Sequence, residues 1–176
     1  MRNLILLFFV VFCALANAQQ GKVIKGVKFY RIISNSKLEF KKDAQNNFYA
    51  EIVKGNDFVF EYLKSDDKHT DRTDDEHFER ILFAVNKNKK KFYYSDTTLK
   101  AAFLIGCFCR ERGWYTFSDG FIKGEKINTT TWKVEFDAMT KPDPSRLANA
   151  ITRKFIANFT PHIQKVLKKN DPNSHH

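Results

Sequence analysis

Apolar and polar residues alternate along much of the chain between residues 27 and 139. This period of two predicts β-strands, because successive side chains of a strand point to opposite faces of a sheet. Two alternating stretches, 48–53 and 58–62, flank Lys54-Gly55-Asn56-Asp57, a sequence typical of turns. The arrangement predicts a β-hairpin. A second hairpin is predicted over residues 78–96, with a charged turn at 86–91.

The predicted strands continue to residue 139, after which the period changes. Residues 98–109 are mostly apolar and predict a buried strand, and residues 113–139 predict three more. Four apolar residues then recur at four-residue spacing, which predicts a helix that Asp143 caps and Pro144 starts. Pro161 would end that helix and start a second one over 161–169. The four apolar residues are Leu147, Ile151, Phe155 and Phe159.

Together these elements predict an α+β fold. Seven or eight antiparallel strands would form a sheet, either curved or closed into a barrel, with a C-terminal helix or broken helix pair covering it. We expect one domain over residues 19–170, because no repeat or linker divides the chain. Residues 171–176 are expected to form a disordered tail.

The first 18 residues have the layout of a secretory signal peptide. Arg2 precedes an apolar run, 4–15, and Ala16-Asn17-Ala18 is a small-x-small cleavage site. We therefore expect cleavage after Ala18 and a mature protein that is secreted or periplasmic. No later segment reaches the roughly 20 apolar residues that a membrane-spanning helix needs.

The chain is strongly basic and rich in phenylalanine. Its 30 Lys and Arg residues exceed its 20 Asp and Glu residues, which gives a net charge of +10. An exported basic protein favours an anionic surface such as lipid headgroups, a glycan or nucleic acid, although no nucleic-acid-binding motif is present. The 18 Phe residues indicate either a core of large rings or a cavity lined by them.

Cys107 and Cys109 lie one residue apart on the predicted buried strand. In a regular strand their Cβ atoms would be roughly 6.5 Å apart, whereas a disulfide needs about 3.8 Å. We therefore predict two buried thiols that pack in the core. A disulfide would require a kink, which Gly106 permits. A zinc site would require about four ligands, and the histidines lack the spacing of such a site.

Aromatic and basic residues supply the candidate binding site. Trp114, Tyr115 and Trp132 lie on predicted strands and would line a pocket or form a stacking platform, with Arg110 and Arg112 nearby. The alternative is that the rings pack half-buried on the sheet. We predict a small exported protein without catalytic activity that binds a small ligand or a protein partner through this pocket or sheet face. We expect no cofactor and no metal.

The second hypothesis is an enzyme. It ranks below a binding protein because the sequence lacks the common catalytic motifs. It has no nucleophile elbow, zinc-protease motif or phosphate-binding loop. A secreted hydrolase or nuclease-like effector would have to assemble its site from His77, Glu79, Arg110 and Arg112. A structural subunit of an envelope assembly is the third hypothesis. The acidic stretch 65–77 lacks the glycine and spacing of a calcium loop, so it predicts a solvated surface loop.

Overall fold

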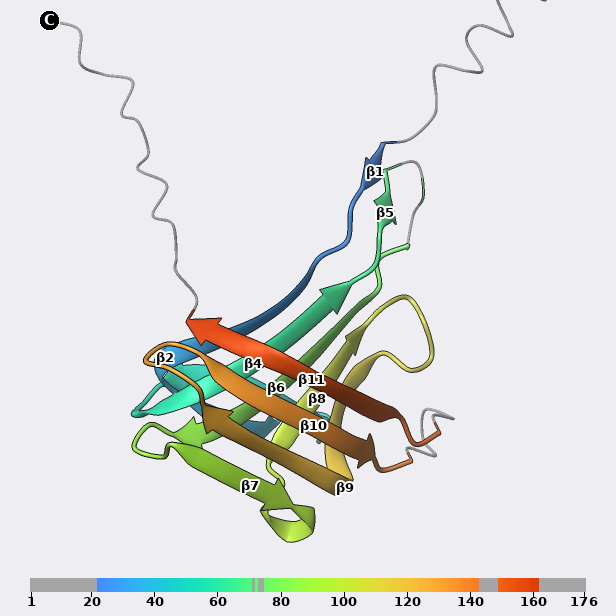
Figure 1. The fold of residues 1–176 in the computed structure, drawn as a ribbon. Coiled ribbons are helices and arrows are strands. Elements are labelled where there is room, and N and C mark those ends of the chain that lie inside the picture. The colour runs from blue at the N-terminus through green and yellow to red at the C-terminus, as the bar shows by residue number, and fades with distance from the viewer. Residues whose placement is uncertain (1–21, 71, 73–74, 143–148, 162–176) are drawn as a thin grey trace, which may run out of the picture.

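The described part of the chain is built from β-strands, as the alternating pattern predicts (Figure 1). The computed structural model describes residues 22–70, 72, 75–142 and 149–161. The predicted signal peptide, the predicted start of the first helix at 143–147, the second predicted helix beyond residue 161 and the predicted tail lie outside them. The strands are β1 (Val23–Ile24), β2 (Lys28–Lys42), β3 (Phe48–Lys54), β4 (Asp57–Ser65), β5 (Lys68–His69), β6 (Phe78–Asn86), β7 (Lys91–Ser95), β8 (Ala101–Gly106), β9 (Gly113–Lys126), β10 (Trp132–Thr140) and β11 (Thr152–Pro161). A short 3-10 helix, η1 (Asp96–Thr98), is the only helical element of the described residues.

The strands form two layers that enclose the main core. β2, β4, β6 and β8 pair as one antiparallel layer, while β7, β9, β10 and β11 form the other. In Figure 1, β10 and β11 cross in front of β4, β6 and β8. The layers join through the antiparallel pair β8–β9 on one side. On the other side they join where Thr160 and Pro161 pair in parallel with Arg31 and Ile32. The pairing of the strands therefore closes on itself.

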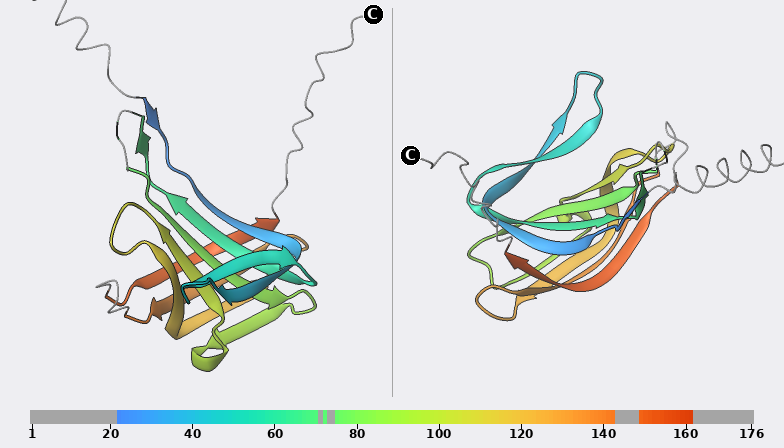
Figure 2. Two further views of the ribbon diagram at one scale, coloured as in Figure 1. Left: turned by 180° about the vertical axis from the view of Figure 1, so that it is seen from behind. Right: turned by 90° about the horizontal axis from the view of Figure 1, so that it is seen from above.

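β2 changes partners along its length, and the first predicted hairpin is wrong for this reason. Its first half pairs with β4, and its second half, from Ser36, pairs with β3. Between the halves, Asn35 has a φ of 52°, a left-handed conformation that asparagine adopts more readily than most residues. β3 and β4 therefore both pair with β2 and not with each other. The resulting β2–β3 hairpin rises from its layer (Figure 2).

The second predicted hairpin is also wrong. β6 pairs with β4 and β8, whereas β7 pairs with β9 in the other layer. The charged turn between them does form, and the Lys89 amide donates to the Asn86 carbonyl at 3.0 Å. A turn sequence between two alternating stretches thus marks a change of direction, but it does not determine which strand each stretch will pair with.

Aromatic side chains fill the space between the layers. The Phe60 ring stacks on Phe83 with centroids 5.0 Å apart, and it meets the Trp132 ring edge-on at 5.6 Å. Phe136 and Phe159 are fully buried in the same cluster. Each buried ring stabilises the fold by about 1.5–3 kcal/mol. Much of the chain's phenylalanine therefore builds the core.

The predicted C-terminal helix over the sheet is wrong, because the described part of this segment forms β11. A spacing of four residues fits one face of a helix, but it also fits one face of a strand, since four is twice the strand period. The residues between these apolar positions distinguish a helix from a strand. Arg153 and Ala157 face the core with Phe155 and Phe159, while Lys154 pairs with an acidic residue on the outer surface. The described residues therefore form an all-β structure in place of the predicted α+β fold.

Within the described residues, no helix has the length and apolar character that a membrane crossing requires.

Candidate functional site

The three aromatic residues predicted to bind a ligand do not form a common platform. Trp132 is 1% exposed in the core between the layers, and Tyr115 is buried in the same core. The Tyr115 hydroxyl donates to the Glu111 carbonyl at 2.5 Å. Trp114 packs instead on a second, smaller apolar cluster on the opposite face of its layer. Since successive residues of a strand face opposite sides, Trp114 and Tyr115 cannot line one pocket.

Arg110 and Arg112 lie on the connection between β8 and β9, which projects from the molecule in Figure 1. We call residues 106–112 the tip loop. β8 ends at Gly106, and the chain then bends so that Cys107 and Cys109 form a disulfide with their Cα atoms 5.2 Å apart. The prediction of two buried packing thiols is therefore wrong, because the strand does not continue through the cysteines.

The base of the tip loop is a glycine covered by a phenylalanine ring. Gly106 of β8 pairs with Phe78 of β6, and a Cβ atom at residue 106 would overlap the Phe78 ring. Phe78 is half-buried, and it lines a hollow of about 470 Å³ beside the tip loop. The missing side chain at Gly106 thus allows the ring to support the point where the chain leaves the sheet.

Phe108, at the end of the tip loop, is the most exposed large apolar side chain of the described residues, with 75% of its surface accessible. It lies between the two bonded cysteines, so the disulfide constrains the backbone beneath it. Two hollows flank the ring. The larger one includes Cys107, and the smaller one, of about 370 Å³, includes Cys109. Sequence reasoning missed Phe108, because a strand through residue 108 would have packed it on the sheet.

Basic side chains outnumber acidic ones around the tip loop, even when Glu111 of the loop itself is counted. Lys68 and Arg72 line the larger hollow together with Glu76, while Arg110 and Arg112 line the smaller one. Lys68 forms an ion pair with Glu76, and this hydrogen bond raises the pKa of Lys68. The surroundings of Phe108 therefore favour a partner that carries negative charge.

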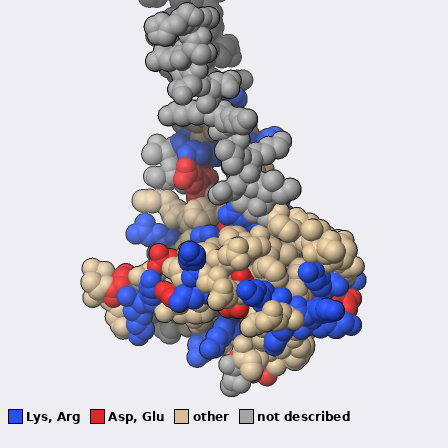
Figure 3. Space-filling model, turned by 90° about the vertical axis from the view of Figure 1, so that its left-hand side faces the viewer, with Lys and Arg blue, Asp and Glu red and all other residues tan. Residues whose placement is uncertain are grey.

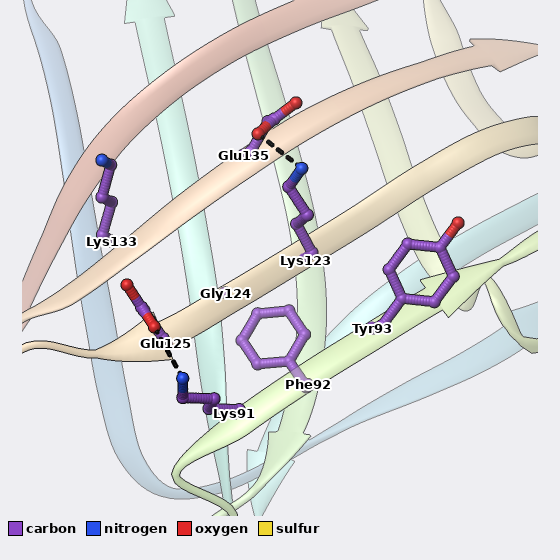
Figure 4. Close-up of a pocket in the computed structure, with 8 residues that line it drawn as sticks. All are labelled: Lys91, Phe92, Tyr93, Lys123, Gly124, Glu125, Lys133 and Glu135. Atoms are coloured by element: carbon purple, nitrogen blue, oxygen red, sulfur yellow. Dashed lines mark ion pairs between the residues drawn. The ribbon is translucent and has the colours of Figure 1, made fainter.

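A second candidate site, which we call the groove, lies on the outer face of β7, β9 and β10 (Figure 4). It has a volume of about 430 Å³. Lys123 forms an ion pair with Glu135 at 2.9 Å, and Lys91 forms one with Glu125 at 3.1 Å. These carboxylates offset much of the positive charge that the groove would otherwise present to a ligand.

The remaining groove residues differ in how they are held. Lys133 forms no ion pair with any residue that the structure describes. Tyr93 is 62% exposed and stacks on Phe121 with ring centroids 6.0 Å apart. Phe92 faces the core beneath the groove. On the side of the molecule seen in Figure 3, basic side chains are more widespread than acidic ones, and the whole chain carries a net charge of +10, so positive charge alone does not single out the groove.

Two carboxylates are buried and paired with arginines, and the sequence pattern does not predict either pairing. Glu61 is 1% exposed, and its Oε1 accepts a hydrogen bond from Arg80 Nε at 2.6 Å while its Oε2 forms an ion pair with Arg31. A buried charge is tolerated when it is paired in this way. Its position in the otherwise apolar stretch "FVFEYL" is the one sequence signal that it is unusual.

Glu79 is the second buried carboxylate, and it belongs to the set predicted for an enzyme. Arg153 binds both of its oxygens, with Arg153 Nε 2.9 Å from Glu79 Oε2. His77 interacts elsewhere, since its Nδ1 lies 2.9 Å from Asp66 Oδ2. A hydrogen bond from Lys64, together with the charge of Lys64, lowers the pKa of Asp66. His77 and Glu79 thus have separate partners. The helix predicted for residue 153 concealed its pairing with Glu79.

Among the described residues, no three His, Cys, Asp or Glu side chains gather in an arrangement that could hold a metal ion. No family model, curated protein or solved structure matches this chain.

Proposed function

We propose that this chain is a small exported binding protein without catalytic activity, and that its tip loop binds a protein partner. The partner segment would carry acidic and apolar side chains. The observation that supports the proposal is the exposed Phe108 ring, which stands on a disulfide-closed turn between two hollows. Export is an expectation from the N-terminal sequence.

A single exposed phenylalanine is common on protein surfaces, and what distinguishes Phe108 is the constraint on its backbone. The disulfide restricts the backbone on both sides of Phe108 before any partner binds. Binding therefore costs little further ordering of the loop, which favours affinity. Aromatic side chains of this kind are frequent anchors of protein interfaces. The adjacent hollows would accept side chains of the partner on either side of the ring.

Charge defines the partner further. Two acidic side chains, Glu76 in the larger hollow and Glu111 on the tip loop, face four basic ones that line the hollows: Lys68, Arg72, Arg110 and Arg112. Such a surface accelerates association with an acidic segment and disfavours a basic one. Affinity should therefore fall as the salt concentration rises.

The test is a selection of displayed peptides against the immobilised protein, using a library that contains no cysteine. We expect enriched peptides to combine acidic with apolar residues. Their binding should weaken at least about tenfold in Phe108→Ser, because an anchor ring typically contributes more than 1.4 kcal/mol. Tyr93→Ser is the matched control, since Tyr93 is also an exposed aromatic residue on a basic surface.

Peptides that bind both variants equally, or that lose binding only in Tyr93→Ser, would contradict the proposal. The second result would place the binding surface at the groove. A protein that selects no peptide above background at low salt would also contradict it.

A further inference from the structure

We infer that the Cys107–Cys109 bond is a thiol–disulfide exchange site whose substrates are cysteine pairs of proteins. The substrate class rests on the proposed function, because it assumes that the tip loop meets a polypeptide. The exchange chemistry rests only on the disulfide and its surroundings.

The Cys107–Cys109 disulfide should contribute little to the stability of the fold. It joins residues two apart in one turn, so it links no two strands and no two layers. A disulfide stabilises a fold mainly by restricting the unfolded chain, and this effect decreases as the enclosed loop shortens. The base of the tip loop is already held by the β8–β9 ladder, where Ile105 pairs with Gly113. Opening the bond should therefore leave the fold intact.

The two sulfur-bearing residues lie in different environments. Cys109 is exposed, and it lines the smaller hollow with Arg110 and Arg112. Cys107 is half-buried and packs against the main core. An incoming thiolate can therefore approach Cys109 more easily than Cys107, and access of this kind is one of the factors that set exchange rates.

The arginines would act on the reduced form. A thiolate at Cys109 would share the smaller hollow with Arg110 and Arg112, whose two positive charges exceed the one negative charge of Glu111 between them. Positive neighbours stabilise thiolates, and stabilising the reduced form makes a disulfide a stronger oxidant. The surroundings of the bond thus favour accepting electrons from a partner dithiol.

The exchange proceeds in two balanced steps. A partner thiolate attacks Cys109 Sγ, the Sγ–Sγ bond breaks, and Cys107 leaves as a thiolate that takes a proton from water. The second thiolate of the partner then attacks the partner sulfur of the mixed disulfide and expels Cys109 as a thiolate. Two electrons pass from the partner dithiol to the cysteine pair, so the partner gains a disulfide and Cys107 and Cys109 become thiols. The reverse steps reduce a partner disulfide.

The first experiment equilibrates the oxidised full-length protein in glutathione buffers of graded composition, then alkylates the free thiols. Peptide mass mapping assigns the redox state of Cys107 and Cys109, and circular dichroism reports whether the fold persists. We expect reversible reduction with an unchanged spectrum. In the double variant Arg110→Gln, Arg112→Gln, the equilibrium constant for reduction should fall about tenfold.

Lys133→Gln is the matched control, because it removes a positive charge far from the cysteines and should change that constant less than about twofold. The inference is overturned if the bond resists millimolar reduced glutathione until denaturant is added. It is equally overturned if reduction unfolds the protein, or if the double variant behaves like the control.

The second experiment mixes the oxidised protein with a reduced acidic peptide that contains two cysteines. Transfer predicts a loss of two hydrogens from the peptide and a gain of two by the protein. In Cys107→Ser, which has no disulfide, the Cys109 thiolate should instead attack the disulfide of the oxidised peptide and expel one peptide thiolate, and alkylation of that thiolate traps the mixed disulfide at Cys109. Exchange with glutathione but not with this peptide would overturn the assigned substrate class. Because the peptide selection described above uses no cysteine, failure of exchange and failure of binding are separate results.

Discussion

The tip loop and the groove share one local arrangement, a glycine paired with a phenylalanine on the neighbouring strand. They differ in how deeply that phenylalanine is buried. In each, a glycine of one strand pairs with a phenylalanine of the next, Gly106 with Phe78 and Gly124 with Phe92. Phe92 is 6% exposed and belongs to the main core, whereas Phe78 is half-buried beside a hollow. The groove therefore lies on the outer face of a layer whose inner face packs on the main core. The tip loop projects from the sheet, so its surface can change without loss of the fold.

The largest predicted effect is on the free energy of unfolding, which should fall much more when Phe92 beneath the groove is replaced than when Phe108 at the tip is replaced. Phe92→Ala removes a ring that packs against Phe60 and Trp132, and it should lower the free energy of unfolding by about 3–5 kcal/mol. Phe108→Ala removes a ring that is mostly solvated, and it should change that free energy by less than about 0.5 kcal/mol. Denaturant titration followed by tryptophan fluorescence measures both.

Similar values for the two variants would contradict this comparison. A large loss in Phe108→Ala would mean that the tip loop packs on the rest of the protein more extensively than its exposure indicates. The peptide-binding proposal would then lose its main support, because the ring would not be free for a partner.

The second prediction concerns the glycine beneath the groove. In Gly124→Ala the new Cβ would lie 2.6 Å from the Phe92 ring and 3.2 Å from the Lys133 carbonyl oxygen. The ring is confined by its neighbours in the core and the carbonyl belongs to the sheet, so neither can move far. Overpacking of this kind costs about 1–3 kcal/mol, partly offset by the lower entropy of alanine in the unfolded chain. Thermal unfolding should show a lower Tm.

The sequence predicts where most strands lie but not how they pair. Alternation identifies the strands well, including β3, β4 and β6, because it depends only on which face each side chain occupies. It says nothing about partners, so both predicted hairpins are wrong. The pattern predicts a helix where β11 forms, because Ile151, Phe155 and Phe159 fit both periods. The polar Lys154 and Asn158, which would fall on the apolar face of that helix, were the available signal.

The residues predicted to bind a ligand do not stay together in the structure. Arg110 and Arg112 were named, and both lie on the tip loop, while the three predicted rings lie elsewhere. The sequence pattern does not predict the exposure of Phe108, because the apolar run continues past Gly106 and does not show that β8 ends there, where the Phe78 ring of another strand lies against the glycine. Contacts between distant segments decide such bends, and a single sequence does not report them.

The third prediction applies the glycine test to the tip loop. Gly106→Ala would displace the Phe78 ring, which can turn toward the adjacent hollow because it is only half-buried. The free energy of unfolding should therefore change by less than about 1 kcal/mol, since strain and the entropic benefit of alanine nearly cancel. Peptide binding at the tip should nevertheless weaken several-fold as the ring fills the hollow. Gly124→Ala is the control for binding, and unchanged binding in Gly106→Ala would show that this hollow is not part of the site.

The smallest predicted effect tests whether the charges of the groove are engaged with each other. Lys123 Nζ and Glu135 Oε2 are 2.9 Å apart, and the side chains are 49% and 29% exposed. A double-mutant cycle of Lys123→Gln and Glu135→Gln should give a coupling free energy of about 0.2–1 kcal/mol that decreases in high salt. Because the pair is internal to the groove, neither change should alter peptide binding at the tip loop. A coupling of zero would leave Lys123 available to an anionic ligand and would make the groove the stronger competitor for the binding function.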